Sequence, residues 1–443
     1  MKTRYNYQIT TLGCKVNQCE SEAIAHQLDS AGGSLCASDD PKTNVCIINT
    51  CTVTGKAAMQ SRQAIRQAVR SHPDALIIVT GCYAQTDPDE IRRIAGIDYI
   101  IGNSDKHEIP QLLFSPVNPP ESPVCRVRDI SKERCFHPLS VVASSDSRTR
   151  PFLKIQDGCN TFCTYCIVPY ARGRSRSMPS GDVLNHIRRL KDDGYKEVVL
   201  TGIHLGCYGL DLSPETSLLS LLRRIADSRC IDRVRISSIE PHELSPDIIR
   251  LVSESDVFCR HFHIPLQSGD DDILKKMHRP YTRSFFRDLA FQIHDMMPDA
   301  AIGVDTLIGF PGETPAAFEN TRSLIEEIPT TYLHVFPYSP RKNTPAAGLP
   351  DQVRPPVSRE RCRVMRDLGN RKKKQFYQNS IGSRQQILVE DKRDPKSGLL
   401  KGLSSNYIPV LIRGDDSLKN SIVTVQVDRY ESDNGVSGTI VDF

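Results

Sequence analysis

Three cysteines near the middle of the chain have the spacing of cluster ligands. Cys159, Cys163 and Cys166 stand on one short segment, directly after Gly158. Three thiolates on one loop can each bind one iron of a four-iron cluster, which leaves the fourth iron open to another ligand. The alternative is a structural zinc site, but such a site normally has four ligands in paired two-residue spacings. The segment therefore predicts an open metal cluster, and an open metal position indicates chemistry rather than scaffolding.

Three earlier cysteines are candidates for a second site. Cys14, Cys51 and Cys82 each lie just past an apolar segment that is predicted to be a strand. Because the C-terminal ends of parallel strands share one edge of a sheet, these distant residues can converge there. The alternative is three buried cysteines that pack as small hydrophobic side chains. The neighbouring Gly13 and Gly81 favour a metal site, since bound thiolates need close backbone approach and N–H donors.

Polar residues at other predicted strand ends are candidates for a binding pocket. Gly202 and His204 lie in a glycine-containing loop, and Glu240, Gln267 and Ser268 follow two later strands. Such residues can bind the hydroxyl, amino and carboxylate groups of a small ligand. They can also cap helices or bond to loop amides. The five residues are therefore candidates for contact with a cofactor, and their spacing alone leaves the structural role open.

Two basic segments are candidates for nucleic-acid binding. One follows the central cysteines, and the other precedes the C-terminal part of the chain. Their candidate residues are Arg172, Arg174, Arg176, Lys372, Lys373 and Lys374. A guanidinium can bind two phosphate oxygens at once, which suits an RNA backbone. The alternative is a solvated helix face, which is the usual role of a run of like charges.

The cysteines require a framework of strands and helices. Short apolar segments alternate with helical patterns up to about residue 103, which is typical of a doubly wound parallel sheet. The same alternation resumes after residue 151, and six βα units suggest a partial barrel with its chemistry at the C-terminal strand ends. After residue 380, short strands separated by Gly, Asn, Asp and Ser predict a small β-barrel. The predicted strands are 7–11, 45–49, 76–80, 99–101, 152–155, 197–200, 233–237, 260–264, 302–307, 332–337, 385–390, 407–412, 422–429 and 437–441.

The composition fits a folded protein of several domains. The 443 residues are 39% hydrophobic and 25% charged, which excludes a disordered or disulfide-stapled chain. The start of the chain has no sustained apolar stretch, so we expect no membrane contact and a cytoplasmic location. There the 15 cysteines would stay reduced, which favours metal ligands over disulfides. The α/β fold is expected to consist of a doubly wound domain at 1–115, a linker at 116–150 with one short strand at 124–127, a partial barrel at 151–378 and a small β-barrel at 379–443.

The central motif, Cys-x-x-x-Cys-x-aromatic-Cys, resembles that of the radical S-adenosylmethionine superfamily. The whole chain resembles the methylthiotransferases of that superfamily, which combine such a barrel with three N-terminal cysteines and a C-terminal TRAM domain. The resemblance implies a catalytic [4Fe-4S] cluster on the central cysteines, S-adenosylmethionine as cofactor, and Tyr165 near its adenine. It also implies a second, auxiliary [4Fe-4S] cluster on Cys14, Cys51 and Cys82, whose open iron carries the sulfur that is transferred.

Three segments, 155–159, 164–177 and 334–339, look most like the branch that acts on N6-threonylcarbamoyladenosine at position 37 of tRNA. That branch implies a transferase that makes the 2-methylthio derivative, with the tRNA anticodon loop as partner and a flavodoxin or ferredoxin as electron donor. The alternatives are methylthiotransferases that act on isopentenyladenosine or on a ribosomal-protein aspartate. Two more are a radical enzyme with inert N-terminal cysteines and a non-catalytic, zinc-containing RNA-binding protein.

Overall fold

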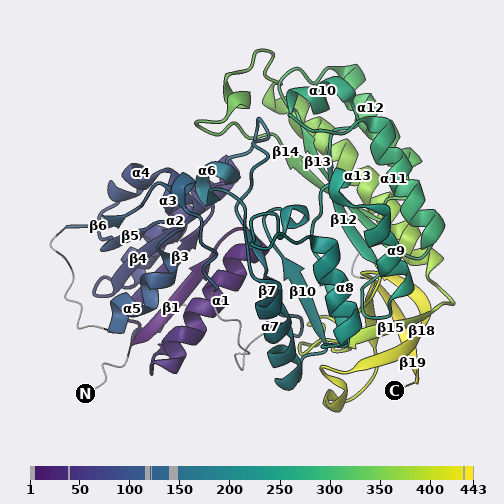
Figure 1. The fold of residues 1–443 in the computed structure, drawn as a ribbon, viewed down its shortest axis with the longest axis horizontal. Coiled ribbons are helices and arrows are strands. Elements are labelled where there is room, and N and C mark those ends of the chain that lie inside the picture. Colours follow the sequence, from purple (N-terminus) through teal and green to yellow (C-terminus); the bar gives the residue numbers. More distant parts are fainter. Residues whose placement is uncertain are drawn as a thin grey trace.

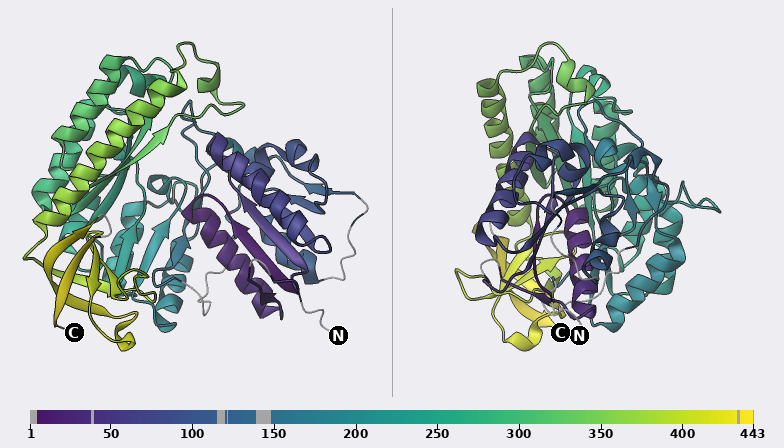
Figure 2. Two further views of the ribbon diagram at one scale, coloured as in Figure 1. Left: turned by 180° about the vertical axis from the view of Figure 1, so that it is seen from behind. Right: turned by 90° about the vertical axis from the view of Figure 1, so that its left-hand side faces the viewer.

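The computed structural model describes residues 5–37, 40–114, 120, 122–138, 148–432 and 435–442, which form three units (Figure 1). Parts of the predicted linker, residues 115–119, 121 and 139–147, lie outside the described residues. The N-terminal unit lies beside the central unit, and the C-terminal barrel lies at one end of the central unit (Figure 2). The predicted α/β architecture is confirmed. In the described ranges, no helix has both the length and the apolar character needed to cross a membrane.

The N-terminal unit is a six-stranded parallel sheet with strand order β2-β1-β3-β4-β5-β6. Helices α1 and α5 pack on one face and α2 and α4 on the other, which is why β3 and β4 are buried along their whole length. The short strand expected at 124–127 is β6, so this part of the predicted linker is an edge strand of the sheet. The elements are β1 Asn6–Thr11, α1 Lys15–Ser30, β2 Ser34–Leu35, β3 Val45–Thr50, α2 Gly55–Ser71, β4 Leu76–Gly81, α3 Cys82–Thr86, α4 Pro88–Arg92, β5 Tyr99–Ile101, α5 Ile109–Phe114 and β6 Val124–Arg126.

The central unit is an open partial barrel of six parallel strands. The strands pair as β7-β10-β11 and β12-β13-β14, and two isolated parallel bridges, Val234 to Phe258 and Ser238 to His263, join the two sets. All six predicted strands are therefore confirmed. The elements are β7 Phe152–Lys154, β8 Gln156–Asp157, α6 Val168–Arg172, β9 Arg176–Ser177, α7 Ser180–Asp192, β10 Glu197–Thr201, α8 Leu218–Ser228, β11 Arg233–Ile236, α9 Pro246–Glu254, β12 His261–Gln267, α10 Asp271–Lys276, α11 Arg283–Met296, β13 Ala301–Ile308, α12 Pro315–Glu327, β14 Tyr332–Pro337 and α13 Pro355–Asn379.

The interior of the partial barrel, which we call the lumen, is polar. Alternate residues of each strand, such as Leu153, Val234 and Phe262, belong to the large apolar core beneath the outer helices. Because side chains alternate between the two faces of a strand, their neighbours face the lumen. These neighbours include charged and aromatic residues, among them Glu197, Arg233, Arg235, His261, His263, Asp305 and Tyr332.

The C-terminal unit is a closed barrel with strand order β15-β16-β17-β19-β18. Its turn after β16 closes one end of the lumen, since the Tyr407 ring stacks on His261 with a centroid distance of 4.5 Å. Arg235 of β11 also donates hydrogen bonds to the carbonyls of Ser404 and Ser405 (3.1 and 3.0 Å). The elements are β15 Arg384–Val389, β16 Leu400–Ser404, β17 Pro409–Ile412, β18 Ile422–Ser432 and β19 Gly435–Asp442, of which β16 was not predicted. Short 3-10 helices are η1 Lys106–Glu108, η2 Ile130–Lys132, η3 Leu205–Cys207, η4 Pro241–Glu243, η5 Pro345–Gly348 and η6 Asp416–Leu418.

A buried group of charges, which we call the interface network, joins the N-terminal unit to the barrel. Arg172 Nη1 lies 2.9 Å from both Glu20 Oε1 and Asp157 Oδ1. Lys154 Nζ pairs with the same two carboxylates at 2.9 and 3.1 Å, and Lys106 Nζ pairs with Glu20. Burial acts to raise the pKa of Glu20, but the three cations hold that pKa well below its usual value. Helix α1 is thereby fixed against β7 and α6.

We expect Arg172→Met to lower the free energy of unfolding by about 3–5 kcal/mol, because the substitution leaves two buried carboxylates with too few cations. Arg174→Met is the matched control, since Arg174 is exposed two residues away. Chemical denaturation under anaerobic conditions measures both variants. Equal unfolding midpoints for the two would contradict this role of the interface network.

Candidate functional site

The central cysteine trio lies on the loop between β8 and α6, after the first barrel strand. At Gly158, φ is +74°, and a Cβ atom there would lie 1.9 Å from the carbonyl oxygen of Arg174, so the tight entry to the loop requires glycine. Burial raises the pKa of Cys166 to about 12, and the neighbouring thiols of Cys163 and Cys159 add to this rise. All three cysteines are free thiols. The loop thus presents three sulfur atoms at close range.

His204 lies against the first of these cysteines. Its Nδ1 atom is 3.2 Å from Cys159 Sγ, and its Nε2 atom is 2.9 Å from Glu243 Oε2. Burial is the largest influence and acts to raise the pKa of Cys159, but the hydrogen bond and charge of His204, together with hydrogen bonds from Thr161, outweigh it, so the pKa lies below its ordinary value. The sequence placed His204 in the cofactor pocket, whereas the structure brings it to a candidate ligand. Glu243, which orients the imidazole, carries no motif and was not predicted.

Gly202 has a packing role in the same loop. A Cβ atom at Gly202 would lie 2.9 Å from Gln156 Oε1. That oxygen accepts hydrogen bonds from the backbone N–H groups of Ile203 and His204 at 2.9 and 2.8 Å. The glycine therefore lets Gln156 reach the loop that carries His204.

A second group of predicted residues meets beside Cys163. Glu240 accepts a hydrogen bond from Arg279 Nη1 at 2.6 Å, and the Arg279 guanidinium lies 6.0 Å from the centre of the Tyr165 ring. Burial raises the pKa of Cys163, and the positive charge of Arg279 opposes that rise. Sequence reasoning missed Arg279, because a single arginine after a helix gives no signal. Arg279 therefore links Glu240 to Tyr165 in the structure.

The two remaining pocket candidates differ from each other. Gln267 ends β12 at a bulge with a positive φ of 67°. Ser268 is buried, and its hydroxyl lies 3.3 Å from Thr321 Oγ1 of α12 and accepts a hydrogen bond from the N–H of Asp270. Its hydroxyl links a loop to a helix, and the prediction that Ser268 contacts a cofactor stays a prediction.

The structure brings the three N-terminal cysteines together at the C-terminal edge of their sheet. Cys14 precedes α1, Cys51 follows β3 and Cys82 begins α3. A Cβ atom at Gly13 would lie 2.8 Å from Cys51 Sγ. Burial raises the pKa of Cys51 to about 11, with further contributions from the nearby thiols of Cys82 and Cys14. At Gly81, φ is +97°, and a Cβ atom would lie 2.4 Å from the carbonyl oxygen of Thr50.

Both trios border the same interface between the N-terminal unit and the barrel. Asn103 Nδ2 lies 3.8 Å from Cys82 Sγ and donates a hydrogen bond to the carbonyl of Ala171 at 2.7 Å. Ala171 belongs to α6, which begins two residues after Cys166. On the other side, Arg341 donates to Thr52 Oγ1 at 2.5 Å, next to Cys51. The edge that carries one trio thus abuts the loop that carries the other.

The basic residues predicted to bind RNA have mixed environments. Arg172 is 1% exposed and belongs to the interface network, so the prediction that it contacts phosphate is wrong. Arg176 is buried and donates to the carbonyl of Arg174 at 2.7 Å, which removes it as well. Arg174 itself is exposed. The spacing of the three arginines in the sequence could not reveal that Arg172 and Arg176 turn inward to carboxylates while Arg174 does not.

The lysines of α13 also differ from one another. Lys372 donates hydrogen bonds to the carbonyls of Glu326 and Ile328 at 2.6 and 2.8 Å, so it holds the C-terminal end of α12 rather than a phosphate. Lys374 is exposed, and its ammonium lies 5.8 Å from the centre of the Tyr430 ring. Lys373 lies between these two residues and is half-buried. Arg174, Lys373 and Lys374 therefore stay candidates for contact with RNA.

Three cysteines at the strand ends of a partial (βα)6 barrel are the arrangement of a radical S-adenosylmethionine domain, and residues 153–325 match the Radical SAM superfamily. Residues 6–102 match a family described as "Uncharacterized protein family UPF0004". The radical S-adenosylmethionine methyltransferase TsrM of Kitasatospora setae has a similar fold, with a TM-score of 0.57, 15% identity, and coverage of 78% of this chain and 75% of that chain.

Curated relatives cover nearly the whole chain. Threonylcarbamoyladenosine tRNA methylthiotransferase MtaB of Bacillus subtilis is 40% identical over 424 residues, which are 94% of this chain and 92% of that protein. tRNA-2-methylthio-N(6)-dimethylallyladenosine synthase of Pelotomaculum thermopropionicum is 34% identical over 95% of this chain and 94% of its own length. The chain belongs to the radical S-adenosylmethionine methylthiotransferase family.

In protein freed of metal, we expect iodoacetamide at neutral pH to label Cys159 faster than Cys166. The thiolate is the reactive form, and a lowered pKa for Cys159 with a raised pKa for Cys166 gives Cys159 the larger thiolate fraction. His204→Leu should shift the labelling of Cys159 to higher pH, while His186→Leu on the outer helix α7 should not. Peptide mass spectrometry across pH measures both effects. A profile for Cys159 that His204→Leu leaves unchanged would argue against the hydrogen bond.

Proposed function

We propose that this enzyme transfers a methylthio group to carbon 2 of N6-threonylcarbamoyladenosine at position 37 of tRNA. The observation that carries the proposal is that two trios of free cysteines border one interface, one on the barrel and one on the N-terminal sheet. Family membership supports the reaction class. The names of the relatives with 34–40% identity support the nucleoside, since MtaB proteins stand among them.

The donor sets fit two [4Fe-4S] clusters. Each trio offers three neighbouring thiols, which matches a four-iron cluster with one iron left open. When bound, the cluster on the barrel supplies reductive cleavage of S-adenosylmethionine, and the cluster on the N-terminal sheet supplies a site for the sulfur that is transferred. In this proposal a flavodoxin or ferredoxin provides the electron.

The chain's own residues position these groups. His204 holds the side chain of Cys159 in place, and Glu243 holds His204. Glu240, Arg279 and Tyr165 line the side of Cys163 and are suited to hold the polar and adenine parts of S-adenosylmethionine. Gln267 is the last residue of β12 and lies at the same end of the barrel.

The RNA must present an unstacked base. A nucleobase can enter a space between two protein units only when it is turned out of its stack, and this is least costly in a single-stranded loop. The anticodon loop therefore suits the site better than a duplex. Exposed Arg174 and Lys374 and half-buried Lys373 are the basic candidates that stay available for its phosphates.

Nucleoside analysis of tRNA from cells that lack this gene tests the proposed substrate. We expect loss of the 2-methylthio derivative of threonylcarbamoyladenosine and its return when the wild-type gene is restored. Loss of the methylthio group from dimethylallyladenosine instead would overturn the assignment. In the same cells, Cys51→Ala should fail to restore the product. Cys46→Ala should succeed, because Cys46 lies on the strand that precedes Cys51 but is buried in the apolar core.

Iron content separates ligation from other effects of the cysteine variants. We expect the anaerobic wild-type protein to hold roughly eight irons per chain and Cys51→Ala roughly four, because one four-iron cluster is lost. Zinc in place of iron would favour a non-catalytic RNA-binding protein. Full methylthiolation by Cys51→Ala would remove the second cluster from the proposal.

A further inference from the structure

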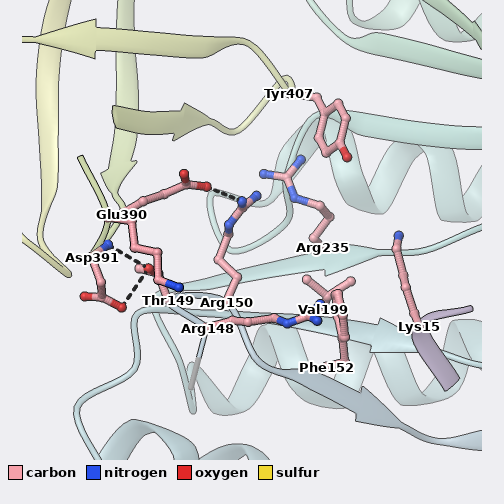
Figure 3. A pocket seen from close by; sticks show the side chains of 11 residues that line it. Lys15, Arg148, Thr149, Arg150, Phe152, Val199, Arg235, Glu390, Asp391 and Tyr407 are labelled. Carbon is pink, nitrogen blue, oxygen red and sulfur yellow. Dashed lines mark hydrogen bonds and ion pairs between the residues drawn. The ribbon is translucent and has the colours of Figure 1, made fainter. Parts of the chain in front are cut away.

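A cavity of about 320 Å³ lies where the three units of the chain meet (Figure 3). Lys15 enters it from the N-terminal unit, and Phe152 and Arg235 line it from the barrel strands. Tyr407 of the C-terminal barrel forms another part of its wall. The cavity is continuous with the lumen side of β7, β10 and β11, because Phe152, Val199 and Arg235 are paired neighbours across these strands.

The lining of the cavity is positively charged. Five of its residues are lysine or arginine, and two are acidic. Arg150 pairs with Glu390 at 2.5 Å, and Arg235 pairs with Glu197 at 2.8 Å, so these arginines are already neutralised in part. The excess of positive charge over the acidic residues fits an anionic ligand.

Lys15 differs from the arginines of this cavity. Among the described residues, no carboxylate lies within ion-pair distance of its ammonium, and the contact that the structure gives it is the Phe152 ring, 5.9 Å away. Figure 3 shows its side chain rising from α1 toward Arg235 and Tyr407. A cation that projects into a cavity without an anionic partner is suited to bind a ligand's negative group.

The place of Lys15 in the chain connects the cavity to the reaction. Lys15 directly follows Cys14, a member of the N-terminal trio. Because Lys15 lines the cavity, the cavity begins one residue along the chain from that trio. Carbon 2 and carbon 6, which carries the N6 nitrogen, are separated by a single ring atom, so a long N6 substituent starts near the reacting carbon and extends beyond the purine ring.

We infer that this cavity receives the carboxylate-bearing N6 substituent of the target adenosine, and that Lys15 is a specificity-determining residue that pairs with the carboxylate. The inference rests on the function proposed above and deepens it. The rings of Phe152 and Tyr407 provide walls for the aliphatic part of the substituent. A purely apolar substituent would leave the Lys15 ammonium desolvated and unpaired, which disfavours its binding.

The test compares two anticodon stem-loop RNAs that differ only at the carboxylate of the N6 substituent. One carries threonylcarbamoyladenosine at position 37, and the other carries its neutral methyl ester. With the reconstituted holoenzyme, we expect kcat/KM for the acid to exceed that for the ester roughly 10- to 100-fold, the range of a charge-assisted pair. The RNAs have identical phosphates, so a preference cannot come from the backbone.

Substitutions then assign the preference to Lys15. Lys15→Met should remove most of the discrimination between acid and ester, and Lys15→Arg should keep it. Lys42→Met is the matched control, since Lys42 is exposed before β3, at the opposite end of the sheet from the trio. Iron and sulfide content shows whether each variant keeps its clusters. If Lys15→Met loses iron, the inference is judged instead from the acid-over-ester preference of the wild-type enzyme and of Lys15→Arg.

Each outcome has one meaning. Equal rates for acid and ester with the wild-type enzyme, or an unchanged preference in an iron-replete Lys15→Met variant, would overturn the inference and leave the proposed function standing. Loss of the preference in an iron-replete Lys15→Arg variant would also count against the ammonium-carboxylate pair. Absence of methylthio product from both RNAs with the wild-type enzyme would instead refute the proposed function.

Discussion

The buried carboxylate of Glu20, shared by Arg172, Lys106 and Lys154, is the interaction on which the site's geometry depends. Its partners are placed in the chain so that both trios are tied to it. Glu20 lies on the helix that begins after Cys14, and Arg172 ends the helix that follows Cys166. Because a buried charge requires its partners close by, the network fixes one cysteine loop against the other.

The polar lumen imposes a second constraint. Glu197 is fully buried, and it is compensated by Arg233 and Arg235 at 3.6 and 2.8 Å. Such pairs contribute little net stability, since the cost of removing charges from water offsets their attraction. They do allow a barrel interior in which charged and aromatic groups stay ordered. The closing C-terminal barrel completes this arrangement, since Arg235 bonds to its backbone.

Much of the fold could be predicted from the sequence, because buried parallel strands leave continuous apolar segments between helical patterns. The main strands of the N-terminal sheet follow this rule, whereas barrel strands such as β11 alternate apolar residues with residues that face the polar lumen and could be predicted from their position between helical patterns. β2 was missed because its two residues, Ser34 and Leu35, are exposed and carry no periodic signal. β6 was predicted as a strand. Its pairing with β5, which makes it part of the N-terminal sheet rather than of the linker, could not be inferred from the local sequence.

The site was less accessible to sequence reasoning. The cysteines could be found because metal ligands are chemically distinctive and lie at strand ends. The partners of Arg172 could not, since Glu20 is 152 positions away in the chain. Arg279 and Glu243 were missed for the same reason, because each acts through a neighbour that only folding provides. Arg176 was assigned to RNA although the fold turns it toward another protein group.

The central claim is that both cysteine trios hold clusters that face one interface. Electron paramagnetic resonance of the fully reduced protein tests it most directly, with two triple alanine variants, one for each trio, as references. We expect the wild-type spectrum to be broadened by magnetic coupling and to differ from the sum of the two variants' spectra. A wild-type spectrum equal to that sum, with both clusters fully loaded, would contradict it.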